Sequence, residues 1–197
     1  MAPICRSAPR RSALTIRQAS AARSGHSAWV RCDGCGFEWG SIPGELVVPS
    51  LREFPDRYAV ELARDGAALR RRPSADVWSA LEYACHVRDV LLVMRERVLQ
   101  VLREPSPPAF TPMGRDERVR DDRYAEQSPD DVARQITDAA EMLAFVFEGL
   151  DEAQWAKRCV YGYPAPAERT LSWVAQQTLH ELDHHLGDLR NSLVSAP

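Results

Sequence analysis

The 197-residue sequence predicts an all-α fold: a four-helix bundle with a long crossover between helices 2 and 3, preceded by a disordered N-terminal tail. Apolar residues recur at helical spacing in four segments of the chain. No alternation of apolar and polar residues continues for more than a few residues, so no extended strands are expected. Two short links and one long link join the four segments, which favours a bundle with one crossover connection.

Residues 1–30 are expected to form the disordered tail, because they contain no acidic residue and no periodic apolar face. Arg, Ser and Ala are abundant there, as in a transit peptide or in sequence read from a start codon placed too early. The second explanation is favoured, because ordered-looking sequence begins abruptly near Val30. There is no continuous apolar signal segment, and the five cysteines are odd in number, so we expect a reducing cytoplasm.

Residues 31–49 form a lead-in, and residues 50–197 are expected to form the bundle. The first helix is predicted over about Ser50–Arg70, where apolar residues follow helical spacing. The second helix is predicted from a capped start at Ser74 to about Leu102. It is apolar almost all round, which is typical of a central helix.

Two breaks separate the remaining helices. Residues 104–127 contain four prolines and a group of Arg, Asp and Tyr side chains. Such a long polar segment could line the mouth of a site or form a solvated crossover. Ser128 and Pro129 then begin the third helix. A second break spans about residues 151–168, and the fourth helix is predicted to begin at Thr170 or nearby.

The composition argues against two classes of partner. The hydrophobic fraction of 45% and the charged fraction of 27% are average for a globular domain. The net charge of -3 argues against a nucleic-acid-binding protein, which usually carries a basic surface. No apolar run approaches the roughly 20 residues that span a bilayer. We therefore expect a small-molecule partner, with neither nucleic acid nor membrane.

The residues with the richest chemistry lie in the predicted fourth helix, where residues 178–189 hold three of the five histidines and three carboxylates. Residues four apart share one helix face. Two such pairs could bind one divalent ion: His180 with His184, and Glu181 with His185. At about 100° per residue, Glu181 and His185 flank the leucine stripe that faces the bundle, whereas the other pair faces solvent. His86, in the apolar second helix, is the expected third ligand.

Two stretches resemble the DinB-like superfamily, which includes mycothiol-dependent maleylpyruvate isomerase and bacillithiol transferases. Residues 78–89, Trp-Ser-Ala-Leu-Glu-Tyr-Ala-Cys-His-Val-Arg-Asp, are similar to the second-helix signature with its metal-binding histidine. Residues 180–189, His-Glu-Leu-Asp-His-His-Leu-Gly-Asp-Leu, are similar to the fourth-helix signature. The resemblance covers about residues 50–193. It implies a four-helix bundle with a divalent metal, often zinc or nickel, at one end.

The superfamily has two variants of the metal triad. In the all-histidine variant a histidine occupies the position at which this chain has Glu181. The isomerase-like variant follows the pattern Glu-x-x-x-His-x-x-Asp-Leu, and this chain matches every fixed position from Glu181 onward. The resemblance thus implies the triad His86, Glu181 and His185 as metal ligands. Asp188 or Asp89 is expected to orient a ligand imidazole.

The resemblance also implies a class of reaction. In thiol-dependent members the metal binds a low-molecular-weight thiol and lowers its pKa, so that the thiolate attacks the substrate. We expect a metal-dependent thiol transferase, isomerase or hydrolase acting on a small molecule, and no catalytic side chain can be assigned. The alternative is a non-catalytic metal-binding bundle with a structural or stress-responsive role. An open cavity facing the metal would favour the enzyme, and a homodimer is compatible with both.

A second motif, Cys32-Asp33-Gly34-Cys35, precedes the predicted bundle. Cys-x-x-Cys is half of a zinc or iron site, which needs two further ligands. Cys85, Cys159 or His26 could supply them, or the second chain of a dimer could do so. Two free thiols in a turn and a redox pair are the other interpretations, and the sequence leaves all three open.

Overall fold

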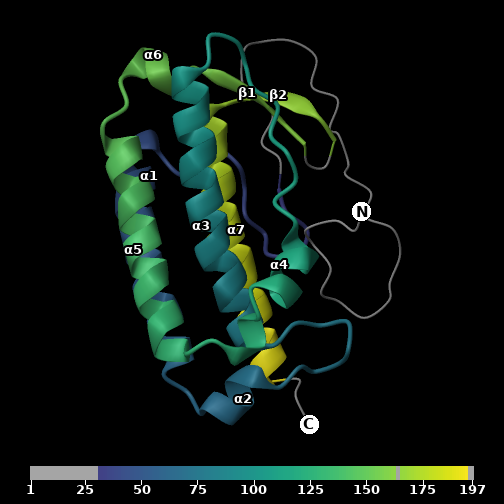
Figure 1. Cartoon of the computed structure of the whole chain (residues 1–197). Helices are drawn as coiled ribbons and strands as arrows, with labels where there is room; N and C mark the ends of the chain where they lie inside the picture. Colours follow the sequence, from purple (N-terminus) through teal and green to yellow (C-terminus); the bar gives the residue numbers. More distant parts are fainter. Residues whose placement is uncertain (1–30, 163–164, 195–197) are drawn as a thin grey trace.

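The computed structural model describes residues 31–162 and 165–194, which contain four long helices (Figure 1). These are α1 (Gly44–Leu62), α3 (Ala80–Arg103), α5 (Pro129–Glu148) and α7 (Leu171–Val194). Helices α1 and α3 occupy opposite corners, because each packs on both α5 and α7. The predicted four-helix bundle is confirmed.

The connection between α3 and α5 is a crossover. These two helices run in the same direction, so the chain between them returns along the bundle from one end to the other (Figure 1). Two short elements lie on the return path, the helix α4 (Arg115–Asp121) and the 3-10 turn η1 (Tyr124–Glu126). The predicted long break is therefore present, but it contains helical turns of its own.

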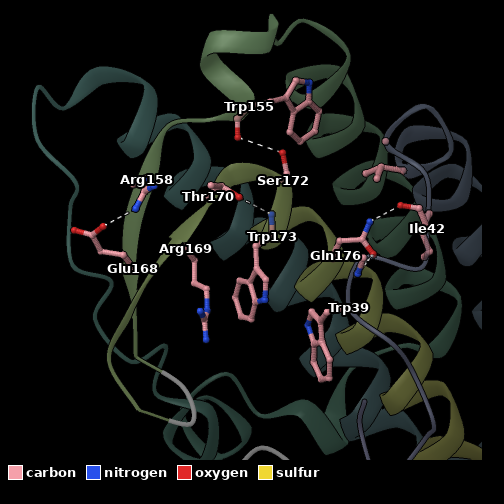
Figure 2. A pocket seen from close by; sticks show the side chains of 13 residues that line it. Trp39, Ile42, Trp155, Arg158, Glu168, Arg169, Thr170, Ser172, Trp173 and Gln176 are labelled. Atoms are coloured by element: carbon pink, nitrogen blue, oxygen red, sulfur yellow. Dashed lines mark hydrogen bonds and ion pairs between the residues drawn. The ribbon is translucent and has the colours of Figure 1, made fainter. Parts of the chain in front are cut away.

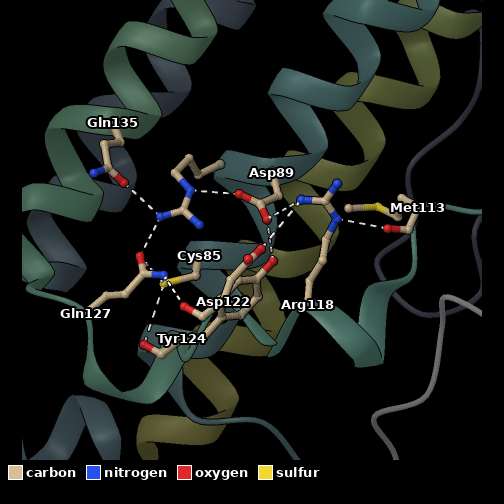
Figure 3. A network of polar contacts seen from close by, with 9 residues as sticks. Cys85, Asp89, Met113, Arg118, Asp122, Tyr124, Gln127 and Gln135 are labelled. Carbon is tan, nitrogen blue, oxygen red and sulfur yellow. Dashed lines mark hydrogen bonds and ion pairs between the residues drawn. The ribbon is translucent and has the colours of Figure 1, made fainter. Parts of the chain in front are cut away.

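A buried carboxylate, Asp89 of α3, fastens the crossover to the bundle (Figure 3). Its oxygens accept hydrogen bonds from the Tyr124 hydroxyl at 2.6 Å and from Arg118 Nη1 at 3.0 Å. Arg88 donates a third hydrogen bond to this carboxylate at 2.8 Å. Charge-assisted hydrogen bonds are stronger than neutral ones, so this network fixes α4 and η1 against the first half of α3.

The first helix differs from its prediction at both ends. It begins earlier, at Gly44, directly after Pro43. It also ends earlier, at Leu62, and a separate helix α2 (Gly66–Arg70) follows. Asp65 caps the start of α2, because its carboxylate accepts a hydrogen bond from the backbone N–H of Ala68, the third residue of this helix, at 3.0 Å.

Helix α3 begins at Ala80 and not at the predicted cap, Ser74. Ser79 and Glu82 form a capping box, in which each backbone N–H donates to the other residue's side chain, at 2.8 and 3.3 Å. The segment starting at Ser74 has no Glu or Gln three residues later. The reciprocal pair therefore determines where the helix starts.

Helices α5 and α7 begin as predicted, after Ser128 and Thr170. The break between them holds a one-turn helix, α6 (Glu152–Trp155), and an antiparallel pair of strands, β1 (Arg158–Tyr161) and β2 (Ala167–Thr170). Each strand has four residues, too few for an alternation to be recognised in the sequence. The hairpin lies at the end of the bundle where α7 begins (Figure 1).

The core lies between the four long helices, and each of them contributes fully buried large side chains, among them Tyr58, Leu81, Phe147 and Leu182. Within residues 31–162 and 165–194, none of the helices combines the length and the apolarity that a membrane crossing requires. The predicted tail, residues 1–30, lies outside the described residues.

Candidate metal centre

The three side chains of the predicted triad converge between α3 and α7. His86 lies in the second turn of α3, and Glu181 and His185 lie one turn apart on α7. One potential ligand atom of each residue lies within 4.8 Å of those of the other two. Their exposed fractions are only 1%, 2% and 2%. Helix packing thus brings distant residues to one buried point.

The triad residues fit a divalent metal. Among the described residues, neither nitrogen of His86 nor Nε2 of His185 has a hydrogen-bond partner. Buried polar atoms almost always have a hydrogen-bond partner. Nitrogens without one are suited to bind a metal ion, which would occupy their lone pairs. His185 Nε2 also lies 3.3 Å from Glu181 Oε2. Two imidazoles and one carboxylate form a known ligand set of catalytic zinc.

The electrostatics of the triad favour a cation at this point. Burial lowers the pKa of His86 well below its usual value, with His185 and Arg115 acting in the same direction, so His86 is a neutral imidazole. Burial also lowers the pKa of His185, but Asp188 and Glu181 outweigh it and raise that pKa to about 9. Burial raises the pKa of Glu181, yet His185 holds it below its usual value. A divalent cation would stabilise the same carboxylate in place of the His185 proton.

Two neighbouring side chains orient the triad. Asp188 Oδ2 lies 2.9 Å from His185 Nδ1, which leaves Nε2 of this ring facing Glu181. Gln177 Nε2 donates to Glu181 Oε1 at 2.5 Å. Of the two carboxylates expected to orient an imidazole, Asp188 contacts one. Asp89 instead binds the crossover (Figure 3).

Aromatic and basic side chains cover the triad. The ring centroid of Trp78 lies 5.2 Å from that of His86, and the centroid of Tyr83 lies 5.8 Å from that of His185. The guanidinium carbon of Arg115 lies 5.3 Å from the ring centroid of Trp78. Because Arg115 belongs to α4, the crossover brings a positive charge to the surroundings of the triad.

His180 and His184 do not face solvent, and the prediction that they would was wrong. Their exposed fractions are 1% and 6%. Residues 32–39 cover this side of α7, where the rings of Phe37 and Trp39 lie 5.4 and 4.5 Å from the His180 ring, centroid to centroid. Helical phase predicts which face of α7 points toward the other bundle helices. It does not predict that the lead-in covers the opposite face.

The lead-in also brings Cys32 and Cys35 to these two histidines. One potential ligand atom of each of the four residues lies within 4.8 Å of the other three. The sequence contains a signal for this cluster, because a Cys-x-x-Cys motif and an i,i+4 histidine pair each offer two ligands. Neither half identifies the other without the fold. Of the additional ligands considered from the sequence, Cys85 and Cys159 are not members of this cluster. His26 lies outside the described residues.

A groove of about 710 Å³ lies near the start of α7 (Figure 2). Trp39, Trp155 and Trp173 are among the residues that line it, and the triad residues are not. Gln176 on its wall precedes Glu181 by five residues, which is about 7–8 Å along a helix. The groove and the triad are therefore neighbouring but separate features of α7.

Protein families provide the first comparison. A family model of the DinB superfamily matches residues 57–189, which is more than half of the chain. A comparison with curated proteins finds no match.

Solved structures provide the second comparison. YfiT from Bacillus subtilis, described as "a probable metal-dependent hydrolase with an unusual four-helix bundle topology", aligns with a TM-score of 0.68 and 16% identity, over 77% of this chain and 88% of its own. A mycothiol-dependent maleylpyruvate isomerase aligns with a TM-score of 0.62 and 16% identity, over 77% of this chain and 62% of its own. This chain therefore spans less than two thirds of the isomerase. At such low identity these similarities establish the fold alone.

Proposed function

The chain belongs to the DinB superfamily, and we propose that it binds a divalent metal ion through His86, Glu181 and His185 and catalyses a reaction of a small molecule there. The main support is the convergence of these buried side chains, with imidazole nitrogens that have no hydrogen-bond partner among the described residues. We propose zinc or nickel as the metal. Thiol transfer, isomerisation and hydrolysis are the proposed reactions, since the two structural neighbours are a mycothiol-dependent isomerase and a probable metal-dependent hydrolase.

Each residue around the triad has a role in this proposal. Three protein ligands leave at least one coordination position open, and a bound metal lowers the pKa of a water or thiol held there. Asp188 Oδ2 contacts Nδ1 of His185 and orients its ring. Gln177 holds one oxygen of Glu181. These contacts fix the direction of two ligands before any substrate arrives.

Positive charge close to the triad favours an anionic substrate. The guanidinium carbon of Arg97 lies 5.1 Å from the ring centroid of Phe110 and 5.8 Å from that of Tyr161. Burial lowers the pKa of Arg97, with Tyr161 and the triad residue Glu181 acting against it, but an arginine remains a cation in proteins. Arg115 adds a second positive charge over Trp78. Carboxylate-bearing small molecules are therefore the first substrates to test.

One observation favours the non-catalytic alternative. The triad residues are at most 2% exposed, and none of them lines the groove of Figure 2. A metal that no substrate can reach would instead stabilise the packing of α3 on α7. The two functions differ in whether a small molecule reaches the metal past Trp78 and Arg115.

Metal analysis of the purified full chain, followed by activity screening, tests the proposal. His86→Ala and Glu181→Gln should each remove one metal equivalent per chain, whereas the control Glu141→Gln, at an exposed carboxylate of α5, should remove none. Wild-type protein should then be screened with low-molecular-weight thiols, electrophilic carboxylates and hydrolysable esters or amides. Turnover that both triad variants abolish supports the enzyme. Metal loss without turnover in any screen supports the non-catalytic bundle, and unchanged metal content in both triad variants contradicts the site.

A further inference from the structure

A second potential metal site lies beside the triad on another face of α7. Cys32, Cys35, His180 and His184 each place one potential ligand atom within 4.8 Å of the others. We propose that these four residues bind one zinc ion in a closed Cys2His2 site that fastens residues 31–42 to α7. This site shares no ligand with the triad and does not depend on the function proposed for it.

The lead-in forms the tight turn that a Cys-x-x-Cys zinc site requires. The backbone N–H of Cys32 donates to Phe37 O at 2.7 Å, and that of Gly36 donates to Cys32 O at 2.8 Å. Gly36 has a φ of 80°, in the left-handed region that favours glycine. This turn carries both thiols to the histidines of α7.

The distances in the cluster suit tetrahedral coordination. With Zn–S bonds of about 2.3 Å and Zn–N bonds of about 2.0 Å, the ligand atoms of a tetrahedron lie roughly 3.3–3.8 Å apart. Cys32 Sγ and His184 Nδ1 are 3.8 Å apart. No pair of ligand atoms is more than 4.8 Å apart, so bound zinc would require shifts of only about 1 Å.

The histidine nitrogens distinguish a metal site from a redox pair. Among the described residues, both ring nitrogens of His180 and Nε2 of His184 are buried without a hydrogen-bond partner. The His180 Nδ1–Glu181 Oε1 and His184 Nε2–Asp188 Oδ2 distances, 3.9 and 3.5 Å, are too long for strong hydrogen bonds. A disulfide within the Cys-x-x-Cys motif would leave the His180 nitrogens as they are. A zinc ion would bind one nitrogen of each histidine, so it accounts for more of the cluster.

Gly34, between the two cysteines, permits the close approach of the turn to α7. A Cβ atom at this position would lie 2.9 Å from Cε1 of His184 and 3.8 Å from Sγ of Cys32. The first distance is shorter than real Cβ contacts allow. Because His184 is buried, its ring cannot move away without leaving the cysteines. Position 34 therefore requires a residue without a Cβ atom for the two halves of the cluster to meet.

Three of the four proposed ligands are buried and Cys35 is partly buried, as is typical of structural zinc. The exposed fractions of Cys32, His180 and His184 are 7%, 1% and 6%. The rings of Phe37 and Trp39 lie against His180. Structural zinc sites use four protein ligands and leave no open position, in contrast to catalytic sites. We therefore assign this zinc a structural role.

The zinc would hold one wall of the groove in Figure 2. Trp39 and Ile42 line this groove and belong to the lead-in. Trp39 Nε1 donates to Gln177 Oε1 at 2.9 Å, and Ile42 O accepts from Gln176 Nε2 at 2.7 Å. Zinc bound at Cys32 and Cys35 would hold the chain a few residues before Trp39 and Ile42. The position of this groove wall therefore depends on the zinc.

Spectroscopy of the wild-type full chain tests the proposal directly. Loaded with Co²⁺, the chain should show thiolate-to-cobalt charge-transfer absorption, and zinc X-ray absorption should show sulfur at about 2.3 Å. The triad contains no sulfur, so His86→Ala should retain both signals. A Cys32→Ser/Cys35→Ser variant should lose both signals and one metal equivalent. Sulfur-free spectra of the wild-type chain would overturn the site, whatever the metal content of the triad.

Two glycine variants test the contact between the turn and α7. Gly34→Ala should lower the affinity of the sulfur-containing site for Zn²⁺ by about ten-fold or more, measured by competition with a chromophoric chelator. It should also speed amide hydrogen exchange in residues 31–42. Gly187→Ala is the matched control, because a Cβ there meets nothing within 4 Å. Equal zinc affinities of the two variants would contradict the packing of Gly34 against a metal ligand.

Discussion

His184 and His185 are adjacent in the sequence, yet one belongs to the cysteine-containing cluster and the other to the triad, and Asp188 lies close to both. His185 meets Glu181 on its own helix and His86 on α3, inside the bundle. His184 meets His180 and the two cysteines of the lead-in, outside the bundle. Successive residues of a helix point about 100° apart, so one helix can present neighbouring histidines to different parts of the molecule.

The two clusters also differ in ligand chemistry. The triad offers two nitrogens and one oxygen, and three protein ligands leave room for a substrate. The cysteine-containing cluster offers two sulfurs and two nitrogens, which complete a tetrahedron. Asp188 joins them, because its Oδ2 lies 2.9 Å from His185 Nδ1 and 3.5 Å from His184 Nε2. The comparison therefore separates a set of three ligands, which would leave a coordination position free on a metal, from a set of four, which would not, and the two sets share a neighbouring carboxylate.

Alanine substitutions at the two adjacent positions, His184 and His185, should have the largest effects on metal content. His184→Ala should remove the sulfur-bound metal and keep the triad metal, and His185→Ala should do the reverse. Cobalt absorption and metal equivalents per chain measure both outcomes. His184→Ala should also lower the free energy of unfolding by about 2.7 kcal/mol when free zinc exceeds the dissociation constant a hundred-fold, because the native state alone binds the ion.

Loss of the same metal in both variants would break the distinction between the clusters. It would mean that the four potential ligands on α7 serve a single ion. Chemical denaturation of each variant with and without a chelator provides the control, because the chelator should remove only the stabilisation that comes from the one metal each variant still binds.

Asp188→Asn should have an intermediate effect on metal affinity, and the effect should differ between the two clusters. The change keeps the shape of the side chain but removes the charge that supports the imidazole of His185. Loss of such a supporting carboxylate costs about 10–100-fold in metal affinity. The triad should lose more affinity than the cysteine-containing cluster, because the contact to His185 is the shorter one. Competition titrations that resolve the two cobalt spectra measure this order, and the reverse order would contradict it.

The fold followed from the sequence because its signals are local. Helical periodicity located four apolar segments, and Ser128 with Pro129 marked the start of α5 correctly. The start of α3 was mispredicted, because Ser74 resembles a cap while the reciprocal bonds of Ser79 and Glu82 determine the boundary. Where two capping signals lie close together, the one that satisfies more backbone donors determines the helix start.

The candidate sites show where local signals end. The position of Glu181 and His185 beside the leucine stripe could be calculated from helical phase, and the structure brings His86 to them. Metal binding at this point stays a prediction. The burial of His180 could not be calculated in the same way, because it depends on where residues 32–39 pack. That contact joins two segments far apart in the chain, and no periodicity encodes it.

Tyr58→Phe should have the smallest effect, and it tests whether the ligands or the packing of α7 control the metals. The buried Tyr58 hydroxyl donates to Leu182 O at 2.7 Å, within residues 180–185 of α7, which carry ligands of both clusters. Burial raises the pKa of Tyr58 well above its usual value, so the hydroxyl stays a neutral donor. Its removal should cost about 1 kcal/mol, or about 2–4 °C in melting temperature, because the Leu182 carbonyl also lies in the hydrogen-bond ladder of α7. Both metals should be retained with unchanged affinity. If affinity at the triad instead fell as far as in Asp188→Asn, the packing of α1 on α7 would control that cluster, and the distinction drawn from ligand chemistry would be insufficient.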